Sequence, residues 1–375
     1  MALLRELIQP AQLERCGDRS FPVLSMTMHD GIMLQSDRFK KSLASVDQSA
    51  YKVVRRNQLV VGFPIDEGVL YIQQVVDAGI MSPAYDVWNV DETKVDLRYF
   101  ELCLHSPQSM MFYKTNLRGT TARRRSLPKE TLLSLPVPVP SMERQRIIAS
   151  AIDCLQALIR LRQHQLCSLD ELIKARFVEM FGEPISNDRL LPMVTLADLG
   201  SWNSGGTPSR TNPAFFEGDI DWYSAGELNS LYLNGSIERI TAEALEKSAA
   251  KLFPKGSMLV GMYDTAAFKM GILRKASTSN QACACIEPNE KVNILWLYYC
   301  LQIMKPYFME QRRGIRQKNL NLGMIKSFQI PYGDYEQQCS FAAFVSQVDK
   351  SKLSIQSSLD QLETLKQSLM QEYFG

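Results

Sequence analysis

The chain has 375 residues, of which 45% are hydrophobic and 22% are charged, and its formal net charge is only +2. This composition is typical of a folded protein with two or three domains and argues against large-scale disorder. The near-neutral charge excludes a uniformly polycationic chain. A nucleic-acid surface would therefore need local clusters of Lys and Arg.

The first residues lack the basic region and unbroken apolar run of a signal peptide, and no apolar run approaches the ~20 residues that cross a bilayer. The sequence thus predicts a cytoplasmic protein without membrane contact, whose eight cysteines stay reduced. Cys283 and Cys285 form the only close pair, with no second pair or His nearby to complete four ligands. We therefore expect no metal site.

Residues 1–134 read as a strand-rich first domain. Its β-like segments are 21–24, 51–54, 58–63 and 69–72, and helical spacing follows over 95–106. The basic candidates for DNA contact are Lys40, Lys41, Arg118, Arg123, Arg124 and Arg125. A run of arginines is by itself more typical of a solvated, positively charged surface loop.

Residues 135–184 read as a first helical spacer. Three alternating prolines at 136, 138 and 140 favour an extended connector, and Ser141 is a candidate N-cap. A long helix is predicted over about 142–181, because apolar residues recur at steps of four and three. The predicted seam comprises Ile148, Ile152, Leu155, Ile159, Leu166 and Leu169, continuing to Ile173, with Arg162 interrupting it.

This spacer is repeated at the end of the chain. Residues 328–375 align with 135–182 at a constant offset of 193, without a gap, so that Gln145 falls on Gln338. The second spacer, 328–375, predicts a helix over about 335–374 with a seam at Phe341, Val345, Val348, Ile355, Leu359 and Leu362. Two such helices, each following a globular domain, are expected to pair with each other in antiparallel fashion.

Residues 185–327 read as a second domain. Its segment Met258-Leu259-Val260-Gly261 echoes Leu59-Val60-Val61-Gly62 of the first domain. A second basic cluster stands shortly before the second spacer, as the first cluster does before the first. Its members are Arg312, Arg313, Arg316, Gln317, Lys318 and Asn319.

Several motifs resemble those of a known family. Gly-Gly-Thr-Pro-Ser at 205–209, followed by Gly218-Asp219-Ile220-Asp221-Trp222, is similar to the opening of a target-recognition domain in type I restriction-modification specificity subunits. The closing pattern Asn319-Leu320-Asn321, and the order domain, helix, domain, helix over the whole chain, resemble that family too. The first half lacks the Gly-Gly-Thr-Pro motif, and Arg125-Ser126-Leu127 replaces Asn-Leu-Asn.

The resemblance implies an α+β fold with two pseudo-symmetric, strand-rich target-recognition domains and two long helices paired as an antiparallel coiled coil. It implies a non-catalytic subunit that reads double-stranded DNA, each domain reading one half of a bipartite, asymmetric target. It also implies two methyltransferase subunits as partners, nuclease subunits in some systems, and S-adenosylmethionine, Mg and ATP on those partners rather than here. Further candidate DNA contacts are Gly206, Thr207, Ser209, Arg210 and Tyr223.

The sequence argues against a catalytic chain. Asn212-Pro213-Ala214-Phe215 is close to the adenine-binding motif of a methyltransferase but stands in a turn-rich stretch, and Asp86 with Glu92-Thr93-Lys94 vaguely resembles a nuclease element. No Gly-x-x-x-x-Gly-Lys phosphate loop occurs. The alternatives are a specificity subunit of a related two-subunit system and, from another class, a coiled-coil scaffold that binds proteins.

Overall fold

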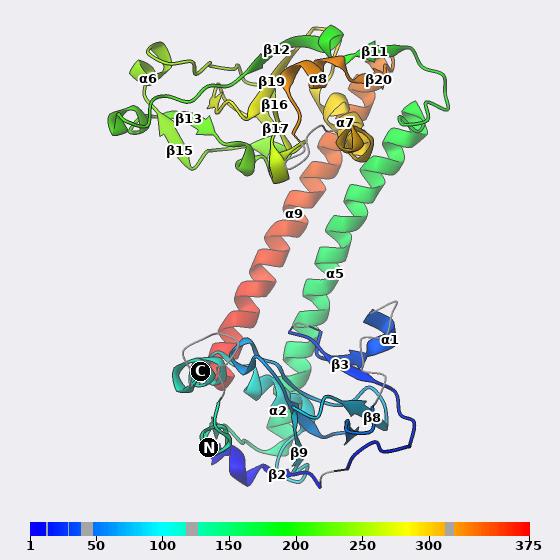
Figure 1. Cartoon of the computed structure of the whole chain (residues 1–375), viewed down its shortest axis with the longest axis vertical. Helices are drawn as coiled ribbons and strands as arrows, with labels where there is room; N and C mark the ends of the chain where they lie inside the picture. Colours follow the sequence, from blue (N-terminus) through cyan, green and yellow to red (C-terminus); the bar gives the residue numbers. More distant parts are fainter. Residues whose placement is uncertain (13, 29, 39–47, 118–126, 312–318) are drawn as a thin grey trace. The chain divides into compact units, whose positions relative to one another are not determined.

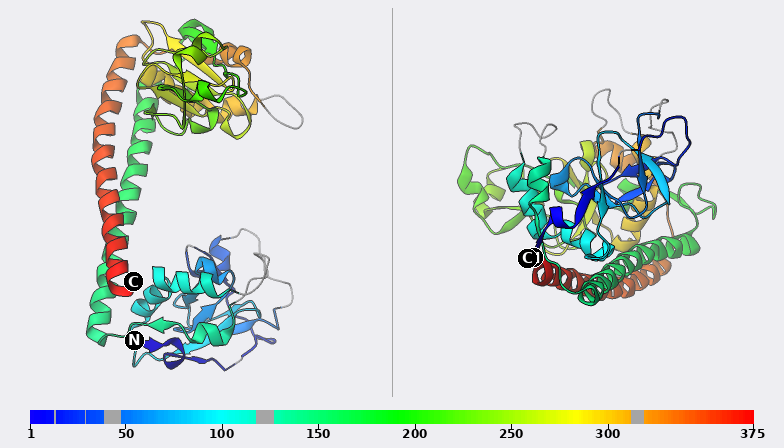
Figure 2. Two further views of the ribbon diagram at one scale, coloured as in Figure 1. Left: turned by 90° about the vertical axis from the view of Figure 1, so that its left-hand side faces the viewer. Right: turned by 90° about the horizontal axis from the view of Figure 1, so that it is seen from below.

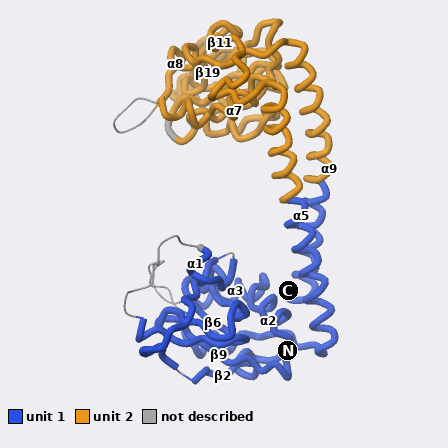
Figure 3. Tube along the Cα trace, turned by 90° about the vertical axis from the view of Figure 1, so that its right-hand side faces the viewer, with its two compact units in different colours: residues 1–163, 357–375 blue, residues 164–356 orange. Residues whose placement is uncertain are grey.

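The computed structural model describes residues 1–12, 14–28, 30–38, 48–117, 127–311 and 319–375. It divides into two compact units (Figure 3). The first unit comprises Met1–Gln163 with Ser357–Gly375, and the second comprises His164–Gln356. Each unit therefore contains one globular domain and parts of both long helices.

The two long helices are α5 (Met142–Phe181) and α9 (Tyr335–Phe374), each of 40 residues. Their ends are explained by local chemistry. The Ser141 hydroxyl accepts a bond from the Arg144 N–H at 3.4 Å, and the Asp334 carboxylate accepts one from the Glu336 N–H at 3.0 Å. Gly182 ends α5 with a φ of 78°, a conformation that favours glycine.

The two helices pack together and run antiparallel (Figures 1 and 2). In the first unit the start of α5 meets the end of α9, because the Arg144 guanidinium lies 5.5 Å from the Tyr373 ring centre. In the second unit the end of α5 meets the start of α9, where the rings of Phe177 and Phe341 are 5.4 Å apart. The predicted α+β class with a paired-helix spacer is confirmed.

The first unit builds its domain from short strands and helices. The strands are β1 (Ala2–Leu3), β2 (Ile8–Pro10), β3 (Leu24–Met26), β4 (Ile32–Leu34), β5 (Lys52–Arg55), β6 (Leu59–Val61), β7 (Leu70–Ile72), β8 (Ala78–Met81), β9 (Asp86–Val90) and β10 (Pro136–Val137). The helices are α1 (Gln35–Arg38), α2 (Leu97–Leu104), α3 (Pro107–Asn116) and α4 (Lys129–Leu133), with 3-10 turns η1 (Leu4–Glu6) and η2 (Ile65–Glu67).

The central sheet of the first unit has the strand order β2-β9-β6-β7 and is antiparallel throughout. Its buried face packs against α2 and the first turns of α5. Tyr99 and Phe100 of α2 and Ile148 and Ile152 of α5 are at most 4% exposed in this core. Burying several such side chains supplies the main stabilisation of the domain on the helix.

The second unit has a larger domain. Its strands are β11 (Met193–Thr195), β12 (Gly200–Ser204), β13 (Ile220–Tyr223), β14 (Tyr232–Leu233), β15 (Glu238–Ile240), β16 (Met258–Gly261), β17 (Met270–Leu273), β18 (Thr278–Ser279), β19 (Cys283–Pro288) and β20 (Gln329–Pro331). The helices are α6 (Ala242–Glu246), α7 (Ile294–Glu310) and α8 (Leu322–Ser327), with 3-10 turns η4 (Leu196–Leu199), η5 (Pro213–Phe216), η6 (Ala225–Glu227) and η7 (Asp264–Ala266).

The main sheet of the second unit has the strand order β12-β19-β16-β17-β14. A separate small sheet has the order β15-β13-β18. The first four strands repeat the order of the first unit's central sheet. Trp296 and Phe308 of α7 are fully buried against this sheet, together with Phe177 of α5 and Phe341 of α9. The two units thus share the order of four strands in their main sheets, and the small sheet β15-β13-β18 lies in the second unit.

A second shared feature is the short strand pair at the entry to each long helix. β1 pairs with β10 and β11 pairs with β20, so that Ala2 lies opposite Val137 and Val194 lies opposite Ile330. Val137 and Ile330 are equivalent at the offset of 193. The opening strand of each domain therefore closes onto the connector that leads into its spacer helix.

Two sequence expectations can be set beside these elements. The long helices were expected over about 142–181 and 335–374, and α5 and α9 have those bounds. The segment 21–24 was expected as a strand, whereas β3 begins only at Leu24 and Val23 forms an isolated bridge with Ile80. Among the described parts of the chain, no helix combines the length and apolarity needed to span a bilayer.

Candidate nucleic-acid interface

Each domain is fixed to its spacer helix by a buried glutamine. Gln145 and Gln338 are 0% exposed and stand one turn into α5 and α9. The Gln145 amide oxygen accepts the Asp96 N–H at 2.8 Å, and the Gln338 amide oxygen accepts the Asn293 N–H at 2.9 Å. Asp96 and Asn293 are the N-caps of α2 and α7, so the same bond joins the same two elements in both units.

The amide nitrogens complete this anchor. Gln145 Nε2 donates to the Pro140 carbonyl at 2.9 Å, and Gln338 Nε2 donates to the Gly333 carbonyl at 2.8 Å. These carbonyls are equivalent at the offset of 193. An amide that both donates and accepts inside a core satisfies two groups that would otherwise be buried without partners. The sequence showed that the glutamines align but not what they bind.

The far ends of the long helices supply a matching aromatic contact. Phe374 of α9 lies 5.4 Å from Tyr99 of α2, and Phe181 of α5 lies 6.1 Å from Trp296 of α7. Phe181 and Phe374 are equivalent in the repeat, and both are at most 3% exposed. Each domain helix therefore packs between the start of one spacer helix and the end of the other.

The residues predicted for the seam are buried or half-buried along the two helices, and their contacts across the pair stay a prediction. Ile148, Ile152, Leu155, Phe341, Val345, Val348 and Leu359 are buried, and Ile159, Leu166, Leu169, Ile355 and Leu362 are half-buried. Arg162 is also half-buried. Lys352 of α9 forms an ion pair with Asp170 of α5 at 2.5 Å beside the apolar positions.

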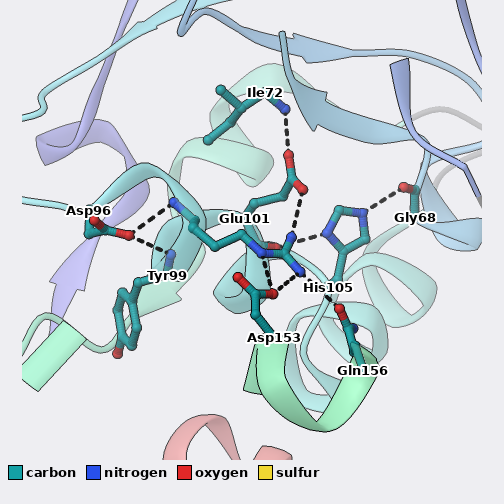
Figure 4. Close-up of polar contacts among 9 residues, drawn as sticks. Gly68, Ile72, Asp96, Tyr99, Glu101, His105, Asp153 and Gln156 are labelled. Carbon is teal, nitrogen blue, oxygen red and sulfur yellow. Dashed lines mark hydrogen bonds and ion pairs between the residues drawn. The ribbon is translucent and has the colours of Figure 1, made fainter. Parts of the chain in front are cut away.

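The first unit adds an arginine network between the domain and α5 (Figure 4). Arg98 of α2 donates from Nε to Asp153 at 2.8 Å and from Nη2 to Gln156 at 3.0 Å, both on α5. Arg98 also pairs with Glu101 at 3.1 Å, and Glu101 accepts the Ile72 N–H at 2.8 Å. The planar guanidinium holds several acceptors in a fixed geometry, which couples β7 to the spacer helix.

The network continues to the loop before β7. His105 places Nδ1 2.8 Å from the Glu101 carbonyl and Nε2 3.0 Å from the Gly68 carbonyl. Figure 4 shows these residues forming a connected set from Gly68 to Gln156. No sequence motif marked Arg98 or His105, because neither residue type at an isolated position predicts its partners.

Each unit has a cavity beside its spacer helix. The cavity of the first unit has a volume of about 400 Å³ and is lined by Arg98, Glu101 and Gln156. The cavity of the second unit has a volume of about 720 Å³ and is lined by Tyr298, Asp349 and other side chains of α7 and α9. Burial raises the pKa of the Asp349 carboxyl, with Lys352 opposing the shift.

The glycine-rich candidates occupy a tightly packed turn of the second unit. The Gly206 carbonyl accepts the Trp222 indole N–H at 2.9 Å, and a Cβ on Gly206 would lie 2.2 Å from the Ala249 carbonyl oxygen. Glycine is therefore required there for packing. Thr207 donates its hydroxyl to Gln281, and Ser209 is exposed next to it.

Arg210 is exposed but already engaged. Its guanidinium lies 4.1 Å from the centre of the Phe216 ring and donates to both oxygens of Glu238, at 2.5 and 2.8 Å. The Glu238 hydrogen bond raises the pKa of Arg210 and lowers that of the carboxyl. A phosphate or base that binds Arg210 must therefore compete with a bidentate carboxylate.

Tyr223 does not lie on the surface. It is 1% exposed, and its hydroxyl donates to Asp221 at 3.4 Å. Burial, followed by the Asp221 charge, raises the pKa of Tyr223 to about 12. Asp221 is 0% exposed and pairs with Arg239 at 3.3 Å and Lys275 at 3.0 Å. The expectation that Tyr223 contacts DNA is corrected to a core role, because sequence pattern does not reveal burial of a single tyrosine.

Most basic candidates lie outside the described residues. These are Lys40, Lys41, Arg118, Arg123, Arg124, Arg125, Arg312, Arg313, Arg316, Gln317 and Lys318. Asn319 is described and is half-buried at the edge of the second stretch. The assignment of these residues to DNA contact stays a prediction.

The catalytic alternatives receive no support from geometry. Asn212 precedes the 3-10 turn η5, and Phe215 in that turn is 8% exposed within a small core, so the tetrapeptide does not follow a strand as a methyltransferase motif does. Asp86 is paired with Lys129 at 2.8 Å, and Lys94 with Asp91 at 3.1 Å. Within the described ranges, no group of His, Cys, Asp and Glu could hold a metal ion.

The sequence of this chain is similar to sequences of known proteins. Residues 192–364 match the family model of the type I restriction modification DNA specificity domain. The specificity subunit of the Escherichia coli type I enzyme EcoR124I/EcoR124II is 24% identical over 185 residues, and that of the Methanocaldococcus jannaschii enzyme MjaIX is 26% identical over 184 residues. Each alignment covers 48% of this chain and 46% or 42% of the relative, so the chain spans about half the length of the curated relatives it matches.

Solved structures extend the likeness in fold to the whole chain. The specificity subunit of the M. genitalium type I system matches with a TM-score of 0.59 at 13% identity, covering 100% of this chain and 95% of that one. A chain from a study of complex assembly and conformational transition in the type I system matches with a TM-score of 0.62 at 15% identity, covering 100% and 96%. With its two units built alike on one pair of helices, the chain has the fold of these type I restriction-modification structures over its full length, and residues 192–364 match the DNA specificity domain.

Proposed function

We propose that this chain is the non-catalytic DNA-recognition subunit of a type I restriction-modification enzyme, in which each unit's domain reads one half of a bipartite, asymmetric duplex target. The observation that carries the proposal is the match of residues 192–364 to a DNA specificity domain, together with the same glutamine anchor in both units. A protein built twice on one helix pair suits a target with two halves at a set separation.

In this proposal the paired helices set the separation of the two half-sites and also bind a partner subunit. Along α5 of the first unit, Ile147, Ala151, Cys154, Leu158 and Leu161 recur at steps of four and three, so they share one face. We call this face the α5 stripe. Ile147, Leu158 and Leu161 are 53%, 38% and 51% exposed. An apolar stripe of this spacing on the outside of a helix pair suits the packing of a further helix.

The occupant that we propose for the α5 stripe is a methyltransferase subunit. The aligned positions on α9 are polar at four of five places, Ser340, Gln347, Ser351 and Ser354. The chain itself thus offers no second copy of this apolar face at the equivalent place. S-adenosylmethionine, Mg and ATP would be bound by methyltransferase and nuclease subunits, and the adenine to be modified would be flipped into the methyltransferase.

The decisive experiment is a genome-wide map of adenine methylation in cells that produce the methyltransferase with and without this chain. The expected result is one bipartite motif, methylated only when the chain is present. Methylation that is unchanged when the chain is deleted would overturn the proposal. Salt-titrated binding of the purified complex to the mapped motif gives an independent readout, since phosphate contacts make affinity fall with salt.

A further inference from the structure

The two units carry equivalent hairpin loops. The first hairpin loop (62–69) joins β6 to β7, and the second hairpin loop (262–269) joins β16 to β17. Each contains a 3-10 turn, η2 or η7, and each has a backbone bond of 2.8 Å at its base, from Gly62 N to the Val69 carbonyl and from Gly261 N to the Lys269 carbonyl. The repeat therefore extends from the helices into these loops.

Both loops also hold a left-handed residue two positions before the second strand. Gly68 has a φ of 80°, and Phe268 has a φ of 58°. A phenylalanine in this region is unusual and is maintained only where its surroundings fix it. Phe268 is 0% exposed and lies 5.3 Å from the Phe308 ring of α7. The second hairpin loop is thus held in one conformation by its own buried anchor.

Each loop exposes one aromatic ring at the same place. Counted back from the second strand, Phe63 and Tyr263 occupy the same position, and they are 56% and 40% exposed. Phe63 is the one phenylalanine with an exposed side chain in the parts of the chain that the structure describes. Exposing a large ring at both equivalent places leaves apolar surface in water unless a partner covers it.

The loops also lie next to the elements that lead into the basic stretches. In the first unit α3 packs beside η2, with Met110 sulfur 3.5 Å from a Cβ built on Gly68, and α3 ends at Asn116, shortly before Arg118 in the sequence. In the second unit Leu320, just after the second basic stretch, donates its N–H to the Met262 carbonyl at 2.8 Å. Both hairpin loops therefore contact chain segments that border arginine-rich sequence.

The second hairpin loop carries one lysine, Lys269, and one aspartate, Asp264. Lys269 donates to Asn229 at 2.8 Å, and burial together with the Lys269 charge lowers the pKa of Lys305 on α7. Neither ammonium forms an ion pair with a carboxylate among the described side chains. Two neighbouring ammonium groups favour an anion such as a DNA phosphate. The first hairpin loop carries Asp66 and Glu67 and no Lys or Arg, and its carboxylates suit the amino group on a base edge.

We propose that the two hairpin loops touch the base pairs of the duplex, with Phe63 making apolar contact in one half-site and Tyr263 in the other. Aromatic and apolar side chains contact thymine methyl groups or press between base steps, and the rigid loops hold the rings in place for this. This inference rests on the proposed function and names the residues through which each unit would discriminate its half-site.

The test uses the full chain in complex with its methyltransferase and the variants Phe63→Ala and Tyr263→Ala. The probes are a duplex carrying the motif mapped for the wild type and two duplexes in which one half-site is scrambled. Each variant is expected to lose roughly tenfold affinity for the intact motif, in line with aromatic contacts to bases. Phe63→Ala should no longer distinguish a scrambled first half-site, and Tyr263→Ala should no longer distinguish a scrambled second one.

Controls separate this inference from folding and from the proposed function. Tyr335→Ala removes a ring that is 42% exposed at the start of α9 and should bind every probe as the wild type does. The salt dependence of binding should not change in the two loop variants, because no phosphate contact is removed. If both loop variants discriminate both half-sites as the wild type does, the inference is wrong while the proposed function stands. If the wild-type complex prefers no motif, the proposed function itself fails.

Discussion

The buried glutamine at the start of each long helix is a single residue that joins its domain to that helix. Gln338 bonds both the Asn293 N–H and the Gly333 carbonyl, and Gln338 itself is 0% exposed. Gln338→Leu keeps most of the side-chain volume but leaves a donor and an acceptor unpaired. We expect it to lower the free energy of unfolding by about 2 kcal/mol, the typical penalty for buried unsatisfied groups.

Thermal unfolding of the full chain measures this effect. Gln347→Leu is the matched control, because it makes the same replacement at an exposed position of α9. The control should unfold at nearly the wild-type temperature. Equal melting temperatures for Gln338→Leu and Gln347→Leu would show that the amide does not anchor the domain.

Single residues also show where sequence reasoning reached its limit. The alignment of Gln145 with Gln338 was visible in the sequence, yet their partners lie about 50 residues away in sequence and come together only in the fold. Tyr223 was a candidate for DNA contact and is a hydrogen-bonded core residue. Gly206 was expected at a DNA contact, and the structure gives it a packing role beside Ala249.

At the scale of elements, the long helices were predictable because their signal is local and periodic. Forty residues without an interior Gly or Pro, a capping residue and a regular apolar stripe determine a helix with little help from tertiary contacts. The small sheet β15-β13-β18 was not predictable, since its parallel pair β13 and β18 joins segments more than 50 residues apart. Strands of two to four residues depend on neighbours that a sequence window does not contain.

The α5 stripe gives a prediction at the same scale. Leu158→Asp places a charge in the middle of the apolar stripe without touching the buried seam, so the chain should remain folded. Co-purification with the methyltransferase subunit should fall by at least tenfold, because burying an unpaired carboxylate in a helix interface is strongly unfavourable.

The repeat supplies the matched control for this prediction. Ser351→Asp introduces the same charge at the aligned position of α9, which is also exposed and polar in the native chain. It should leave co-purification close to the wild-type level. Equal losses in the two variants would assign the effect to charge alone, and an undiminished yield with Leu158→Asp would exclude the α5 stripe as the docking face.

For the whole molecule, the sequence predicted an order of domain, helix, domain, helix, and its predicted boundaries at 134, 184 and 327 follow the sequence repeat. The compact units do not divide there. Each unit takes its domain, part of α5 and part of α9, because the helices pair with each other and each domain packs on both. Boundaries along the sequence cannot describe these two units, because the end of α9 packs with the first domain.

The paired helices lead to a prediction about the whole target. Insertion of seven residues into α5 after Gln163 and seven into α9 after Gln356 adds two turns to both helices at the points where the two units divide. Seven residues preserve the seam, because the stripe repeats every 3.5 residues, and lengthen the spacer by about 10 Å. The methylated motif should keep both half-sites while the gap between them grows by about three base pairs, at about 3.4 Å each.

Four residues inserted into α5 alone put the seam out of register and should abolish specific methylation. A methylation map in which the half-sites change while the gap stays constant would show that the helices do not set the separation.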